Sequence, residues 1–125
     1  MTIGFDEIHV DEGAAGKIIT LTFNEEIRKK DYDLFVPLVE NQIRHNASVR
    51  ILVELHAFKG WTAGAFWEDT MFADKHFNNI DRLAIVGESC WKKGVTLFVK
   101  PFAAAQVRYF EMEAIDQACQ WLAEV

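Results

Sequence analysis

Two side chains that could exchange a proton, Glu54 and His56, stand two residues apart near the end of the apolar run at residues 49–55. Glu54 lies in the run and His56 just after it, so the two could form an acid/base pair near the end of the central strand. The carboxyl ends of parallel strands are also where α/β folds bind their ligands. A surface carboxylate next to a loop histidine explains the same residues more simply. We therefore predict no catalytic residue and a non-enzymatic protein.

The four histidines and the two cysteines form no pattern of metal ligands. His9, His45, His56 and His76 are scattered along the chain without an HxxxH or HExxH pair. Asp74 and His76 are two residues apart, and on a helix such positions point apart. Cys90 and Cys119 are far from a CxxC spacing. We predict no metal site, and the cysteine usage favours a reducing, cytoplasmic setting.

A nucleotide cofactor is not expected either. Gly60 and Gly64 have the spacing of a glycine-rich loop, but the chain lacks the following Lys-Ser/Thr of a P-loop and the third glycine of a Rossmann turn. These glycines more simply free the loop and allow close helix packing. We predict no cofactor.

The elements that must position these residues alternate along the chain in the predicted order ββαβαβαβα. The predicted strands cover residues 5–10, 17–23, 49–55, 82–87 and 106–110, and the predicted helices cover residues 31–45, 63–77, 90–100 and 113–123. A turn at residues 11–16 would join the first two strands as a hairpin. We expect a single α/β domain over residues 1–125, with a mostly parallel five-stranded sheet and helices packed on it.

Three local details follow from the same patterns. Asp31 is expected to cap the first helix, and Pro37 to bend that helix or shift its start. In the last helix, the apolar stripe is expected to consist of Ile115, Ala118, Cys119 and Leu122.

Charge and hydropathy narrow the classes of partner. The 125-residue chain carries a formal charge of -6, which argues against binding nucleic acid through a general basic surface. Its first residues are acidic, unlike a signal peptide, and no segment has the length and apolar character of a membrane span. We expect a cytoplasmic protein, with contact to the inner membrane surface at most peripheral.

Several short motifs carry a resemblance to a known family. They are Asp31-Tyr32, Pro37-Leu38, Ile51–Leu55, Leu83–Gly87 followed by Trp91, Val107–Phe110, and Ala118 with Trp121-Leu122. In this order they resemble the STAS domain, specifically the small SpoIIAA-like proteins, over essentially the whole chain. The resemblance implies a STAS-like fold, which is also similar to the lipid-binding CRAL-TRIO domain.

One departure from the STAS pattern concerns phosphorylation. The antagonists of anti-sigma factors in this family carry Asp-Ser-Ser-Gly after the central strand, and their second serine is phosphorylated. Here the comparable stretch is Trp61-Thr62-Ala63-Gly64, with alanine in place of that serine. Helix capping already accounts for Thr62, so the resemblance does not carry the phosphorylation switch over to this chain.

Aromatic residues concentrate in the middle of the chain, with nine of the 16 between residues 58 and 102. The helix expected at 63–77 has more large apolar side chains than one narrow stripe can bury. Packing between helices 63–77 and 90–100 would account for about half of this surplus by stripe width alone. We predict that the rest form a ligand-binding surface consisting of Trp61, Phe66, Trp67, Met71, Trp91, Phe98 and Phe102.

The helix expected at 90–100 adds positive charge beside these aromatics. Residues 89–110 contain Lys92, Lys93, Lys100 and Arg108 and no acidic residue. Aromatic bodies with lysines suit an anionic membrane surface, and we predict that Lys92, Lys93 and Lys100 contact anionic groups. The same patch could instead complement the acidic remainder of the chain in a homodimer.

Two functions therefore remain open. The first is a binding protein that takes a lipid-like or amphipathic ligand beneath helices 63–77 and 90–100 and associates with a membrane surface through them. The second is a STAS-type protein–protein interaction module without the phosphorylatable serine, acting as a homodimer or with a regulatory protein partner.

Overall fold

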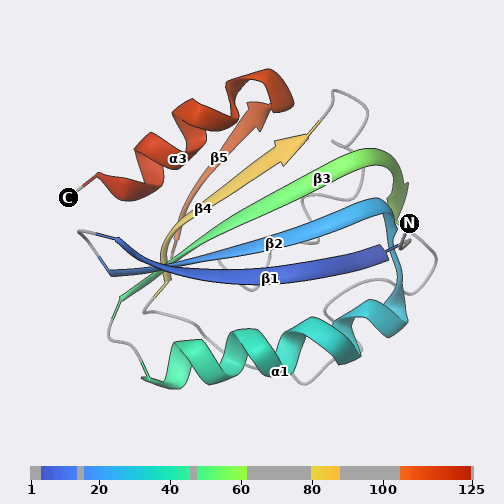
Figure 1. Ribbon diagram of the computed structural model, residues 1–125, viewed down its shortest axis with the longest axis horizontal. Helices are drawn as coiled ribbons and strands as arrows, with labels where there is room; N and C mark the ends of the chain where they lie inside the picture. The colour runs from blue at the N-terminus through green and yellow to red at the C-terminus, as the bar shows by residue number, and fades with distance from the viewer. Residues whose placement is uncertain (1–3, 14–15, 46–47, 62–79, 88–104, 125) are drawn as a thin grey trace.

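In the part of the chain that the structure describes, a five-stranded sheet forms the centre, with a helix on each face (Figure 1). The computed structural model describes residues 4–13, 16–45, 48–61, 80–87 and 105–124. The strands are β1 (Gly4–Gly13), β2 (Gly16–Ile27), β3 (Val49–Trp61), β4 (Ile80–Gly87) and β5 (Gln106–Glu111). The helices are α1 (Lys29–His45), the short 3-10 helix η4 (Met112–Ala114) and α3 (Ile115–Ala123).

The order of strands in the sheet follows the order in the chain, from β1 to β5. β1 and β2 are antiparallel, and every later pair is parallel. This arrangement confirms the prediction of an α/β fold with a mostly parallel five-stranded sheet. The helices predicted at 63–77 and 90–100 lie outside the described residues.

The strands are longer than the sequence pattern indicates, most of all at the end of β3, which continues to Trp61, and also at the hairpin. Pairing of β1 with β2 continues to Gly13 and Gly16, so the turn predicted at residues 11–16 is too long. Gly16 has φ +132°, a conformation that side chains rarely adopt, and a Cβ there would lie 2.6 Å from the Ser48 carbonyl oxygen. Glycine thus lets the strand begin at this point.

Two separate cores lie on the two faces of the sheet. Alternate residues of β2, β3 and β4 face α1 and pack against its buried apolar side chains, which are Phe35, Val36, Val39 and Ile43. The intervening positions face α3, where Leu52, Ala84, Val86 and Phe110 pack against Ala118, Trp121 and Leu122. This division explains the nearly continuous apolar run at residues 49–55, because both faces of β3 are covered.

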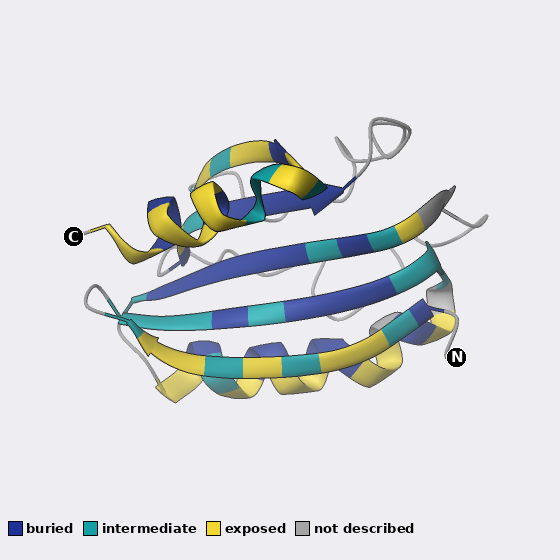
Figure 2. Cartoon of the chain, turned by 45° about the horizontal axis from the view of Figure 1, so that its top comes forward, coloured by how far each residue is buried: buried dark blue, intermediate teal, exposed yellow. Residues whose placement is uncertain are grey.

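α3 covers only part of its face of the sheet, as Figure 2 shows. Its contacts are with β3, β4, β5 and η4. On β1, the side chains of the same face, Glu7, His9 and Asp11, are exposed. The described part of the protein therefore has a thick half, with helices on both faces, and a thinner half at β1 and β2.

The start of α1 differs from the prediction. The helix begins at Lys29, so Asp31 lies in its first turn rather than at the cap. The Asp31 carboxylate accepts a 2.7 Å hydrogen bond from the backbone N–H of Arg28, which directly precedes the helix. This reverse contact still satisfies a free N–H at the helix start. Pro37 lies in the interior of α1, where it is exposed, and the helix continues through it.

Candidate functional site

Glu54 and His56 are in contact with each other near the carboxyl ends of the parallel strands. Both belong to β3, and their spacing of two places them on the same face of the strand. His56 Nε2 lies 3.3 Å from Glu54 Oε1, with the imidazole donating when this nitrogen carries the proton. The Glu54 side chain is largely buried, at 19% exposure, whereas that of His56 is 42% exposed. A carboxylate thus orients a solvent-accessible imidazole.

The backbone beside this pair is irregular in β3 itself and in the neighbouring strand β2. The parallel pairing of Asn24 with His56 is followed by that of Glu26 with Gly60, so β3 has two extra residues at this point. Glu25 and Ala57 both have positive φ, at 68° and 49°. Such left-handed residues other than glycine cost about 1–3 kcal/mol each and cluster at functional sites. The carboxyl-terminal part of β3, with the adjoining part of β2, is therefore the strongest candidate site among the described residues.

Cys119 of α3 lies within electrostatic range of the same carboxylate. Burial, and then the negative charges of Glu54 and Asp116, raise the pKa of the Cys119 thiol above its usual value. A raised pKa leaves the neutral thiol, which is a poor nucleophile, at physiological pH. The arrangement of Cys119, Glu54 and His56 therefore does not favour covalent catalysis through the thiol.

The position of Cys119 also corrects the predicted stripe of the last helix. Cys119 is exposed, and the buried face of α3 consists of Ala118, Trp121 and Leu122. Trp121 takes the place in the core that the spacing gave to Cys119. Ile115, at the start of the helix, is partly buried against the same core.

The predicted ligand-binding residues lie almost entirely outside the described part of the chain. Trp61 is the last residue of β3, so its backbone is at the carboxyl end of the sheet. The other predicted contacts, Phe66, Trp67, Met71, Trp91, Phe98, Phe102, Lys92, Lys93 and Lys100, and also Thr62, fall outside the described residues. Only the ends of the strands that lead into these segments are placed, at Trp61 and Gly87.

Arg108, the fourth cation of the basic stretch, belongs to β5 and faces α3. Its guanidinium lies 5.3 Å from the ring centre of Trp121 and 5.0 Å from that of Phe110. Such distances allow cation–π attraction. Arg108 therefore contributes to the packing of α3 as well as to the local positive charge.

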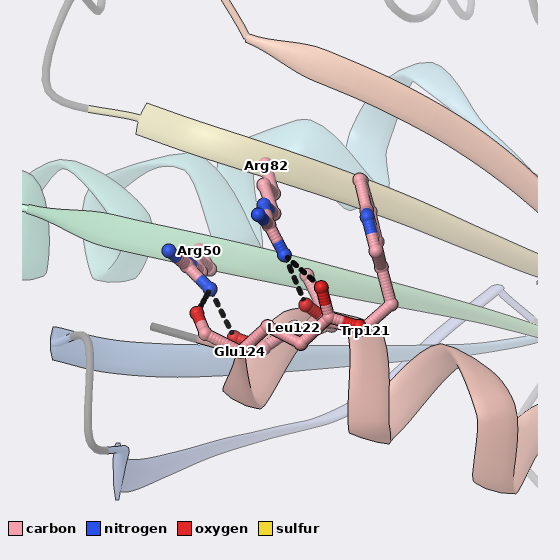
Figure 3. A network of polar contacts seen from close by, with 5 residues as sticks. All are labelled: Arg50, Arg82, Trp121, Leu122 and Glu124. Carbon is pink, nitrogen blue, oxygen red and sulfur yellow. Dashed lines mark hydrogen bonds and ion pairs between the residues drawn. The ribbon is translucent and has the colours of Figure 1, made fainter.

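A polar network that the sequence analysis did not identify lies at the opposite ends of β3 and β4 (Figure 3). Arg50 and Arg82 occupy paired positions on these strands and donate hydrogen bonds to main-chain carbonyls at the end of α3. The signal in the sequence is an arginine in each of two apolar runs, VRILVEL and DRLAIVG. Such a residue needs a buried acceptor, but the sequence does not say which one.

The described residues contain neither a cluster of metal-binding side chains nor a membrane-spanning helix. They contain no group of three or more His, Cys, Asp or Glu side chains that could hold a metal ion. In the same part of the chain, no helix is long and apolar enough to span a membrane.

Comparisons with known proteins agree with this architecture. The model of the SpoIIAA-like family matches residues 18–123. A crystal structure of an uncharacterized DUF3478-family protein from Shewanella loihica PV-4, with a SpoIIAA-like fold, superposes with a TM-score of 0.66 and 18% sequence identity. The match covers 98% of this chain and 96% of that one. No curated protein matches the chain. With the family match spanning most of its length, the chain belongs to the SpoIIAA-like family.

Proposed function

We propose that the protein is a non-enzymatic binding module that takes a lipid-like or amphipathic ligand at the carboxyl ends of β3 and β4. The observation that supports this proposal is the place from which the two aromatic segments leave the sheet. β3 ends at Trp61 and β4 at Gly87, on adjacent parallel strands, and the segments that follow them, residues 62–79 and 88–105, contain seven of the chain's 16 aromatics. Ligand sites of α/β folds form at such strand ends.

The same segments supply the proposed contact with a membrane surface. Lys92, Lys93 and Lys100 follow the end of β4, and residues 89–110 contain no acid. Each lysine near an anionic lipid surface contributes about 1 kcal/mol of attraction. The aromatic side chains would enter the headgroup region while the ammonium groups remain with the phosphates.

Vesicle binding tests the membrane part of the proposal. We expect the protein to bind vesicles of phosphatidylcholine mixed with phosphatidylglycerol more tightly than vesicles of phosphatidylcholine alone. Reversing two charges with Lys92→Glu plus Lys93→Glu should weaken binding to the mixed vesicles by at least about tenfold. Lys17→Glu plus Lys30→Glu is the control with the same change in charge, since Lys17 and Lys30 lie on β2 and α1. Equal binding by both double variants would refute the membrane contact.

The ligand itself is tested by native mass spectrometry and titration. We expect an amphiphile to co-purify with the protein, or a single-chain amphiphile to bind it with one-to-one stoichiometry. Phe66→Ala plus Trp67→Ala should weaken that binding, because aromatic side chains supply most of the buried area of such a site. If no amphiphile co-purifies or binds, the ligand proposal is wrong.

A second candidate function, a module for protein–protein interaction, is favoured by the outer face of α1. Leu34 and Leu38 are 57% and 44% exposed, and their spacing of four places them on adjacent turns. Exposed apolar groups on one helix face suit a protein partner or a second copy of the chain. Sedimentation would distinguish the two functions. A dimer that Leu34→Gln plus Leu38→Gln dissociates, without loss of amphiphile binding, would support the second.

A further inference from the structure

α3 is attached to the sheet by few side chains. It is nine residues long, and only Ala118, Trp121 and Leu122 of these are buried. An isolated helix of this length is not stable in water, so its attachment decides whether it forms. α1 differs in both respects. It has 17 residues, and its buried apolar side chains belong to the larger core, which it shares with β2, β3 and β4.

Two arginines supply the rest of the attachment, and we refer to Arg50 and Arg82 together as the arginine latch. Arg50 Nη1 donates a 2.8 Å hydrogen bond to the Leu122 carbonyl and a further bond to that of Glu124. Arg82 Nη1 donates a 2.5 Å bond to the Trp121 carbonyl and lies 3.4 Å from a carboxylate oxygen of Glu124. These contacts join β3 and β4 to one end of α3 (Figure 3).

The latch binds atoms that need partners. The last carbonyls of a helix accept no hydrogen bond from within the helix, and they form the negative end of its dipole. Guanidinium groups are therefore well matched to them in both hydrogen bonding and charge. The Trp121 carbonyl accepts, besides the arginine bond, a long 3.4 Å bond from the N–H of Glu124, just beyond the helix. The acceptors at Trp121 and Leu122 are main-chain atoms. The hydrogen bonds of the latch therefore require that the end of α3 is folded in place, whatever side chains it carries.

The latch is a costly way to hold a helix. Arg50 is only 7% exposed, and its buried Nε has no hydrogen-bond partner among the residues that the structure describes. Removing one partner of such a buried contact leaves the other without its hydrogen bond and is therefore destabilising. The attachment of α3 thus combines these directional polar bonds with the apolar packing of Ala118, Trp121 and Leu122 on the sheet.

From these observations we propose that α3 opens from the sheet as a separate unit, controlled by the arginine latch. Opening breaks the bonds of Arg50 and Arg82 to the helix end and uncovers the apolar strip of β3, β4 and β5, while the sheet and α1 stay folded. The strip is exposed to solvent in the open form and is covered by α3 in the closed form.

Hydrogen exchange on the full chain tests this proposal. In the wild-type protein, the amides of residues 115–123 should exchange faster than those of β3 and β4, because local opening precedes global unfolding. Arg82→Met and Arg50→Lys should each accelerate exchange in α3 by about tenfold or more, since a hydrogen bond from a charged group is lost or weakened. The rates in β3 and β4 should change much less.

Arg108→Met is the matched control. Like Arg82, Arg108 lies about 5 Å from the Trp121 ring centre, but among the described residues it has no hydrogen bond to α3. It should leave the exchange of α3 within about threefold of wild type, because an exposed cation–π contact is weak. Binding of 1-anilinonaphthalene-8-sulfonate, a probe of exposed apolar surface, should increase in Arg82→Met and not in Arg108→Met.

Two results would overturn the proposal. One is exchange of α3 at the rate of β3 and β4 in the wild-type protein, which would mean that the helix opens only by global unfolding. The other is equal acceleration by Arg108→Met and Arg82→Met, which would assign the effect to packing around Trp121. If Arg50→Lys fails to fold, the comparison of Arg82→Met with Arg108→Met still decides the outcome.

Discussion

The fully buried carboxylate of Asp31 accepts three hydrogen bonds from Arg28. One comes from the backbone N–H at 2.7 Å, and the others come from guanidinium Nε and Nη2 at 3.2 and 3.1 Å. The bond to Asp31 in turn raises the pKa of Arg28 above its usual value. Gly4 makes room for the pair, because a Cβ there would lie 2.5 Å from atoms of both residues. This contact joins the end of β2 to the start of α1.

Removing the charge of Asp31 should therefore destabilise the fold. Asp31→Asn keeps the shape of the side chain but removes the buried negative charge that accepts these three hydrogen bonds, and we expect a loss of about 2–3 kcal/mol in the free energy of unfolding. Urea denaturation at neutral pH measures this value. Asp33→Asn, an exposed substitution two residues further along α1, should change it by less than about 0.5 kcal/mol. Similar losses in the two variants would contradict the assigned role of Asp31.

Two positions with positive φ should respond to substitution with opposite signs. Gly16→Ala introduces a Cβ 2.6 Å from the Ser48 carbonyl oxygen at φ +132°, so we expect it to destabilise the protein by about 1–3 kcal/mol. Ala57→Gly removes a Cβ from a residue at φ 49°, and we expect no loss and a gain of up to about 1 kcal/mol. Thermal unfolding of both variants beside the wild type measures the difference. A loss of stability in Ala57→Gly would show that Ala57 is not strained.

The sequence is sufficient to predict the sheet, because burial on both faces leaves a recognisable pattern in the strands. The runs at 49–55 and 82–87 are apolar at successive positions, and both lie in the centre of the observed sheet. The contact of Glu54 with His56 is likewise predictable, since it depends only on the alternation of side chains along a strand.

Other features depend on tertiary contacts that local patterns do not contain. An acid near the start of a helix could be the cap or a residue of the first turn, and only the contact with Arg28 shows which applies to Asp31. Spacing placed Cys119 on the buried stripe, but the buried face of α3 is rotated about the helix axis toward Trp121, which leaves Cys119 exposed. The acceptors of Arg50 lie more than 70 residues away in the chain, beyond any local pattern.

The thiol of Cys119 should react slowly with alkylating reagents at neutral pH. Its raised pKa, caused by burial and by the charges of Glu54 and Asp116, lowers the fraction of thiolate. The rate of alkylation by iodoacetamide at this cysteine, followed by peptide mass spectrometry, should therefore reach half its maximum at a higher pH than that of a model thiol peptide. Glu54→Gln should shift the midpoint to lower pH, since one negative charge is removed. No shift in this variant would mean that Glu54 does not act on the thiol.

The same raised pKa affects stability at alkaline pH. A thiol whose pKa is higher in the folded state than in the unfolded state stabilises the fold fully below the unfolded pKa, and this contribution is lost as the pH rises through the folded value. The free energy of unfolding should therefore fall above the ordinary thiol pKa more steeply in the wild type than in Cys119→Ser. Parallel pH dependence in the two proteins would exclude Cys119 as the source of the decrease.

The contact of Glu54 with His56 should prove dispensable for binding if the protein is non-enzymatic. Glu54→Gln removes the negative charge from the 3.3 Å contact, and His56→Ala removes the contact itself. The first keeps the shape of the largely buried side chain, and the second removes a side chain that is 42% exposed, so we expect both variants to fold. Binding of vesicles and of a single-chain amphiphile should stay within about twofold of wild type, because neither function proposed for the aromatic segments requires proton transfer. A hydrolytic activity toward amphiphilic esters that is present in the wild type and lost in both variants would assign this contact a catalytic role and contradict the non-enzymatic proposal.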